Sequence, residues 1–167
     1  SHEPHVNVYP PRGIPVAQAT ARLIRDANGL RMVLERDATR HFAQHGEAQA
    51  IDLLMEQTRA IIDRANDEIT NRVQEEAVEI DWRMHDTIID SRGNEIISET
   101  YRINAARIRL ARGLGNRLPR KRLISALTEH LTVLDACRKR QADLAVKEMV
   151  RHIENSLNLN FDPDYLD

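Results

Sequence analysis

The chain has 167 residues, a formal net charge of −2 at pH 7 and aromatic residues at only 4% of its positions. A length of this order fits one domain with a sizeable core, and a charge near zero argues against a domain that binds a polyanion over its whole surface. The sequence has no run of about 18 apolar residues, no secretory signal and only one cysteine, which excludes a membrane-spanning helix and an internal disulfide and favours a cytoplasmic protein.

Helix-forming residues dominate the sequence, and glycine and proline are few, with six of each. Apolar residues recur at helical spacing in six segments, which turn residues such as Gly46 and Arg92-Gly93-Asn94 separate. We predict an all-α fold, an antiparallel bundle of about six to seven helices with a central cavity for a metal and a ligand. The predicted helices cover 16–45, with a potential break at Asn28-Gly29, 47–65, 73–90, 95–114, 119–139 and 141–159.

The two ends of the chain differ from this helical pattern. Ser1-His2 is typical of what an expression tag leaves behind, and a proline-rich stretch follows from Tyr9 to Pro15. We therefore expect residues 1–15 to be a tag remnant and linker, 16–160 to be one helical domain, and 161–167 to be a C-terminal tail.

Four polar residues interrupt the apolar stripes of three predicted helices. Asp81 and His85 lie four residues apart on one stripe, and His130 and His152 each lie on another. A single histidine on an apolar stripe is more often a hydrogen-bonded core residue, and an aspartate and histidine at this spacing often pair locally. Burying an unpartnered polar group costs about 2 to 7 kcal/mol, and one divalent cation would satisfy all four groups at once. Four such placements in three helices therefore favour a buried metal site.

The donor set of this site is three imidazoles and one carboxylate without a thiolate. Zinc or nickel suits it best in our interpretation, with manganese, iron and cobalt as alternatives. A dication bound by three neutral imidazoles and one carboxylate would give the site a net charge of about +1 and would have an open coordination position for water or an anion.

Arginines are the second feature, since eight basic residues and no acidic residue lie between Arg102 and Arg122. This run is either a solvated helix face or, without any supporting motif, a nucleic-acid contact. Arg107 shares an apolar stripe with Asn104, and Arg31 shares one with Phe42. Because guanidinium groups hold carboxylates through two parallel hydrogen bonds, we predict that Arg31, Arg107 and Asn104 bind an acidic effector. Each arginine could instead form a structural ion pair, for which Glu35 is an available acid.

Four stretches of the sequence resemble the FCD domain, the C-terminal effector-binding domain of FadR-type regulators in the GntR family. They are GLRMVLERDATRHFA, DWRMHDTIIDSRGNEII, EHLTVLDACRKRQADLA and MVRHIENSL, and the resemblance runs from about Gly29 to Leu159. In the metal-dependent branch of that family, the ordered Asp-x3-His, Glu-His and final His bind a divalent cation. The resemblance thus assigns Asp81, His85, His130 and His152 as ligands, with Met84 in place of the commoner phenylalanine.

The resemblance implies a domain that binds a small organic or sugar acid and thereby modulates DNA binding by a winged helix-turn-helix. That second domain would contact operator DNA, it is not in this sequence, and such regulators generally act as homodimers. We expect no membrane partner. Two alternatives stay open: a mononuclear metal enzyme that acts on a small carboxylate, and a helical interaction module with a structural metal. Since no additional general base is placed by spacing, we do not expect an enzyme.

Overall fold

A computed structural model describes residues 16–112 and 119–159. The tag remnant and linker expected at 1–15 and the tail expected at 161–167 lie outside the described residues. Within the described ranges the chain is helical and has no strand, which confirms the predicted all-α class. None of the helices in these ranges is both long and apolar enough to cross a membrane.

Six helices make up the described chain, at the positions that the apolar periodicity predicts. The first helix runs through Asn28-Gly29 without interruption, so the potential break there is wrong. The Asn28 side chain donates a hydrogen bond to the Ile24 carbonyl at 2.8 Å within the same helix. The helices are α1 (Val16–His45), α2 (Ala48–Asp67), α3 (Asn71–Asp90), α4 (Glu95–Arg112), α5 (Arg120–Arg138) and α6 (Ala142–Leu159).

Turn residues set the helix ends next to α3 and α4. The Asn94 side chain accepts a hydrogen bond from the Ile97 N–H at 3.1 Å and so caps α4, as its place in the sequence predicts. Gly93 has a φ of 61°, a left-handed conformation that costs glycine little. Thr70 caps α3 by accepting from the Val73 N–H at 3.2 Å, which explains why α3 begins before residue 73.

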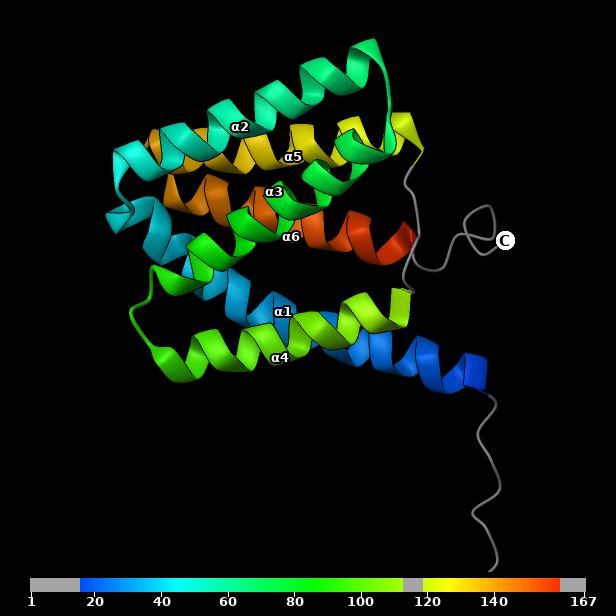
Figure 1. The fold of residues 1–167 in the computed structure, drawn as a ribbon. Coiled ribbons are helices and arrows are strands. Elements are labelled where there is room, and N and C mark those ends of the chain that lie inside the picture. The colour runs from blue at the N-terminus through cyan, green and yellow to red at the C-terminus, as the bar shows by residue number, and fades with distance from the viewer. Residues whose placement is uncertain (1–15, 113–118, 160–167) are drawn as a thin grey trace, which may run out of the picture.

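The helices form a bundle in which α3 has the central place. In Figure 1, α1 and α4 lie side by side along one edge, α2 lies beside α5 along the opposite edge, and α3 crosses between them. The last helix, α6, packs against both α1 and α5. Because α3 contacts α1, α2, α4 and α5, its inward side chains meet groups from most of the other helices.

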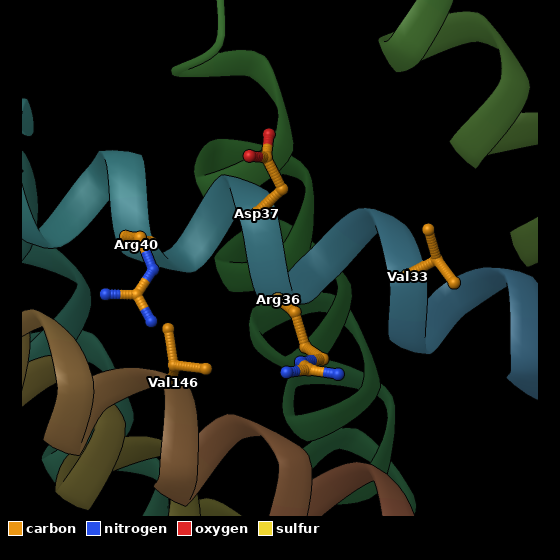
Figure 2. Close-up of a pocket in the computed structure, with 5 residues that line it drawn as sticks. All are labelled: Val33, Arg36, Asp37, Arg40 and Val146. Carbon is orange, nitrogen blue, oxygen red and sulfur yellow. The ribbon is translucent and has the colours of Figure 1, made fainter.

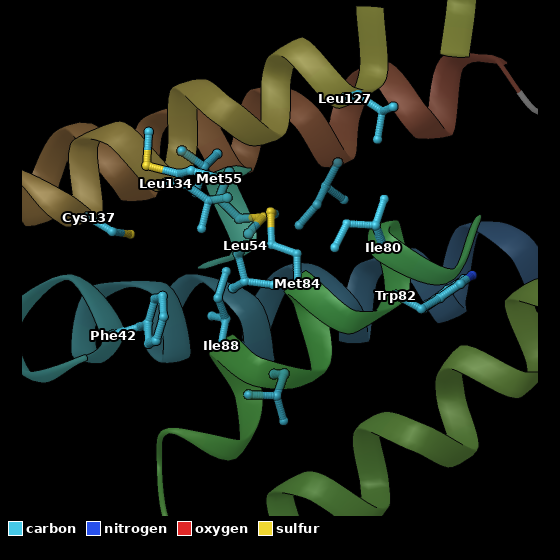
Figure 3. Close-up of a cluster of buried hydrophobic side chains, with 14 of the residues drawn as sticks. Phe42, Leu54, Met55, Ile80, Trp82, Met84, Ile88, Leu127, Leu134 and Cys137 are labelled. Atoms are coloured by element: carbon cyan, nitrogen blue, oxygen red, sulfur yellow. The ribbon is translucent and has the colours of Figure 1, made fainter. Parts of the chain in front are cut away.

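Apolar side chains from all six helices make one buried cluster, of which Figure 3 labels members from α1, α2, α3 and α5. Met84 and Ile88 of α3 and Leu134 of α5 are fully buried in it. Burying one such side chain stabilises the fold by about 1.5 to 3 kcal/mol. The same interior also holds polar groups, since His85 and His130 have no exposed surface at all. Those groups need partners, and the partners define the candidate site.

Candidate metal centre

The four predicted ligands converge in the interior of the bundle. One donor atom from each of Asp81, His85, His130 and His152 lies within 4.8 Å of all the others. The His130 Nε2 is 3.1 Å from the Asp81 Oδ1 and 3.1 Å from the His152 Nε2. The His85 Nε2 is 3.9 Å from the same Asp81 oxygen. Helix α3 supplies two of the donors, and α5 and α6 supply one each.

The spacing of these donors fits one small cation. Donors that each lie about 2.1 Å from a single zinc-sized ion are roughly 3 to 4 Å apart, and the three separations given above lie in this range. The whole set extends to a limit of 4.8 Å, so its widest pair has to move slightly closer around an ion. Two imidazole nitrogens that face each other at 3.1 Å also require a positive centre or a proton between them. The nitrogen and oxygen donors suit zinc or nickel, so the residues present fit the predicted ion.

A buried carboxylate orients His85. The Glu35 Oε2 accepts from the His85 Nδ1 at 2.7 Å, while its Oε1 accepts from the Arg31 Nε at 2.6 Å and from the Tyr101 hydroxyl at 2.8 Å. Burial opposes ionisation of Glu35, but the charge of Arg31 and the hydrogen bonds from His85 and Arg31 outweigh it and hold the pKa of Glu35 well below its usual range. Because an ionised carboxylate only accepts, the proton of His85 lies on Nδ1 and the Nε2 lone pair faces the other ligands.

His152 is oriented in the same manner by Glu129. The Glu129 Oε2 accepts from the His152 Nδ1 at 2.8 Å, and its Oε1 accepts from the Asn155 amide at 2.8 Å. Burial and then the neighbouring His130 lower the pKa of His152 to about 3, so this imidazole is neutral at physiological pH. Among the described residues the His130 Nδ1 has no hydrogen-bond partner. Two of the three histidines are therefore fixed in the tautomer that metal binding requires.

Asp81 differs from the histidines in its contact with solvent, because its side chain keeps 29% of its surface exposed. Burial raises the pKa of this carboxyl, but the hydrogen bond and charge of His130 and the charge of His85 outweigh that effect and hold the pKa well below its usual range. The carboxylate is therefore ionised, and it brings negative charge to the three imidazoles.

The sequence pattern of the FCD domain matches residues 26–155. This chain belongs to the FCD domain family. A solved structure described as "Metal-free FCD domain of TM0439 a putative transcriptional regulator" has the same fold, with a TM-score of 0.60 at 21% identity. The alignment covers 83% of this chain and 91% of that one. No curated protein sequence matches the chain at a comparable level.

Arg31 lies directly beside the predicted ligand set of this FCD domain. Its Nη2 donates to the His85 Nε2 at 2.9 Å, the nitrogen that faces the other ligands. The guanidinium carbon also lies 5.7 Å from the centre of the Trp82 ring, over which Arg109 stands at 4.0 Å. Arg31 is buried, with 2% of its surface exposed. Of the two predicted effector arginines, Arg31 therefore contacts the candidate site, and Arg109 lies nearby against Trp82.

The other two predicted effector residues do not reach this position. Arg107 is exposed on the outer side of α4 and points away from the four converging residues, so its role as an effector residue stays a prediction. The apolar row next to it is itself exposed, since Ile103 keeps 48% and Leu110 keeps 76% of their surface. Asn104 is buried, but its amide donates to the Ala27 carbonyl at 2.7 Å and so joins α4 to α1.

Three residues that complete the site are not among the predicted ligands or effector residues. Glu35 and Glu129 accept hydrogen bonds from His85 and His152, and Tyr101 donates one to Glu35. Glu35 follows Arg31 by four residues, and that spacing was the only sequence signal for it. Glu129 precedes His130, and nothing in its own periodicity separates it from a surface acid.

The pocket in Figure 2 lies elsewhere, on the outer side of α1. No ligand residue lines it, and the predicted central cavity stays a prediction. The surface pocket in Figure 2 is lined by Val33, Arg36, Asp37 and Arg40 of α1 and Val146 of α6.

Proposed function

We propose that this FCD domain binds one divalent metal ion through Asp81, His85, His130 and His152 and senses a small organic or sugar acid at that ion. In this proposal the acid modulates DNA binding by a winged helix-turn-helix domain of a GntR/FadR-type regulator. The observation that carries the proposal is the convergence of three imidazole nitrogens and one carboxylate within 4.8 Å in a helical interior. Zinc or nickel is the expected ion, and manganese, iron or cobalt would also suit these donors.

The charge balance of the site supports an anionic effector. Three neutral imidazoles and one carboxylate leave a bound dication with a net charge of about +1. The ion would supply a Lewis-acidic position for one carboxylate of the effector. Arg31 adds a buried guanidinium at the same place, and guanidinium groups hold carboxylates in a defined geometry. An acid with two or more oxygen donors therefore fits better than a neutral molecule.

The distribution of the ligands over the helices supports a regulatory role. The donors come from α3, α5 and α6, and Glu35 and Tyr101 extend the network to α1 and α4. An effector that binds one arrangement of these helices more tightly shifts the domain toward it. A coupling of about 1 to 3 kcal/mol would change operator affinity roughly 5- to 150-fold. The operator contacts belong to the other domain, and we expect the regulator to act as a homodimer.

Metal content and acid binding test this function together. Purified protein would be loaded with zinc, desalted and measured by elemental analysis and native mass spectrometry. We expect about one ion per chain in the wild type and well below one in His130→Ala and His152→Ala. His41→Ala is the matched control, because His41 lies on α1 outside the ligand set and should leave the metal content unchanged.

Acid binding is measured next, as the shift in melting temperature caused by citrate, lactate and gluconate with and without chelator. We expect at least one acid to raise the melting temperature only when the metal is present. Full metal retention in both histidine variants would refute the metal site. Shifts of the same size in the presence of chelator would refute sensing through the ion.

A further inference from the structure

The outer side of α4 carries a row of exposed apolar residues. Ile96 and Leu110 each keep 76% of their surface exposed, and Ile103 keeps 48%. Single exposed apolar residues are common on protein surfaces, but these three are spaced seven residues apart and therefore lie on one side of the helix. The opposite side of α4 faces the bundle through residues such as Tyr101 and Ile108, which keep 1%. Helix α4 thus has two apolar sides, and the described part of the chain covers only one.

Two opposite charges flank this row at equal distances from its centre. Glu99 lies four residues before Ile103 and Arg107 lies four residues after it, and both side chains are exposed. Within the ranges that the structure describes, neither of them forms an ion pair. Arg102 on the same helix does have a partner, because it contacts the Asp90 carboxylate at 2.7 Å. The row and its flanking charges therefore have the composition of an unsatisfied interface.

We propose that this row is the surface through which two copies of the chain associate, with their α4 helices antiparallel about a two-fold axis at Ile103. Such an axis places Ile103 opposite its own copy and Ile96 opposite the partner's Leu110. It also places Glu99 beside the partner's Arg107, and the two-fold symmetry creates this ion pair twice. A parallel arrangement would instead place Glu99 beside its own copy, which like-charge repulsion disfavours.

The charge pattern favours a second copy over other occupants. A nucleic-acid surface needs an uninterrupted basic face, but Glu95 and Glu99 are exposed in the first half of α4. An unrelated protein partner would not require charges placed symmetrically about one residue. Opposite charges at equal distances from an apolar centre are what a two-fold axis perpendicular to an antiparallel helix pair demands.

The surface is connected to the metal centre through the helix itself. Tyr101 on the inner side of α4 donates to Glu35, which in turn orients His85. A shift of α4 on effector binding would therefore reach the partner copy directly. The assignment of this surface rests on the homodimer expected under the proposed function, but it does not depend on which ion the centre binds.

A charge-exchange experiment tests the register of the interface. The dimer dissociation constant would be measured by analytical ultracentrifugation for the wild type, Glu99→Arg, Arg107→Glu and the double variant. Each single change replaces two attractive contacts by two repulsive ones, so we expect it to weaken the dimer at least about tenfold. The double variant restores both pairs with reversed sign and should return to within about threefold of the wild type.

A cysteine at the axis tests the geometry independently. Ile103→Cys should form a disulfide between two chains under mild oxidation, because a residue on the axis faces its own copy. Leu53→Cys is the matched control, since Leu53 is exposed to a similar degree (53%) on α2 and should not form a disulfide. The native Cys137 is buried and does not interfere.

The outcomes separate this inference from the metal centre. We expect Ile103→Asp to be monomeric with full metal content, and His130→Ala to lose the metal but stay dimeric. A wild type that is monomeric at millimolar concentration would overturn the proposal. So would a double charge variant as weak as the singles, or equal cross-linking at Ile103→Cys and Leu53→Cys.

Discussion

Replacing Arg31 by glutamine removes a contact that competes directly with a metal ion. The Arg31 Nη2 donates to the His85 Nε2 at 2.9 Å, and that nitrogen carries the lone pair that a metal would use. Metal binding therefore has to break this hydrogen bond and to bring a dication close to a guanidinium. Arg31→Gln removes the charge and, with its shorter side chain, the contact. We expect the variant to bind zinc more tightly than the wild type.

The magnitude follows from the kind of bond that is lost. A hydrogen bond to a charged group contributes about 1.5 to 3 kcal/mol, which corresponds to roughly 10- to 150-fold in the dissociation constant for zinc. The same change removes the ion pair between Arg31 and Glu35, whose side chains are 3% and 0% exposed. Breaking a buried pair costs about 3 to 5 kcal/mol, or roughly 6 to 20 °C in the melting temperature of a domain of this size.

The assay is a competition titration with a chromogenic zinc chelator at pH 7.5, together with thermal unfolding of the metal-free protein. Arg36→Gln is the control, because Arg36 lies on the exposed side of α1 and should change neither zinc affinity nor stability by much. The variant should also lose any shift in melting temperature that an acid causes, although it holds the metal. A folded Arg31→Gln protein with the zinc affinity of the wild type would refute the competition argument.

Two further outcomes are expected. Glu129→Ala leaves the His152 Nδ1 without its acceptor, so this variant should bind zinc about 10- to 100-fold more weakly than the wild type. Glu154→Ala, on the exposed side of α6, is the control and should bind zinc with the affinity of the wild type. Equal zinc affinities of the two variants would show that Glu129 does not orient His152. Burial raises the pKa of the Cys137 thiol to about 12, so little thiolate exists at pH 7.5, and a maleimide should label the protein only after unfolding in guanidinium chloride. Rapid labelling of the folded protein would contradict the buried position of this residue.

The helices and the convergence of the four polar residues were predictable because their signals are local. Apolar spacing together with turn residues such as Asn94 marks where α4 begins, and the capping bond confirms it. His85 and His130 stand out as polar residues on apolar stripes, and a stripe requires no knowledge of the partner helix. Because the same pattern occurs on α3, α5 and α6, the sequence alone predicts one site made of residues from three helices.

The rest of the site depends on contacts between distant segments. Glu35 and Tyr101 are 66 residues apart and meet only because α1 packs against α4. The position of Arg107 is not predictable from periodicity, because α4 is apolar on two sides and the spacing does not show which of them faces the core. The exposed row around Ile103 has the same spacing as a buried stripe, so periodicity alone does not distinguish this surface row from the core.

Helix α1 continues without a break for 30 residues, and Arg31 and Glu35 lie near its middle. At about 1.5 Å per residue, its first residue Val16 lies about 22 Å along the axis from Arg31. If α1 moves as a rigid helix, a tilt of about 5° at Arg31 would displace its first turn by about 2 Å. A rearrangement too small to disturb the packing around His85 is therefore large enough, at the far end of α1, to reposition whatever the chain carries there.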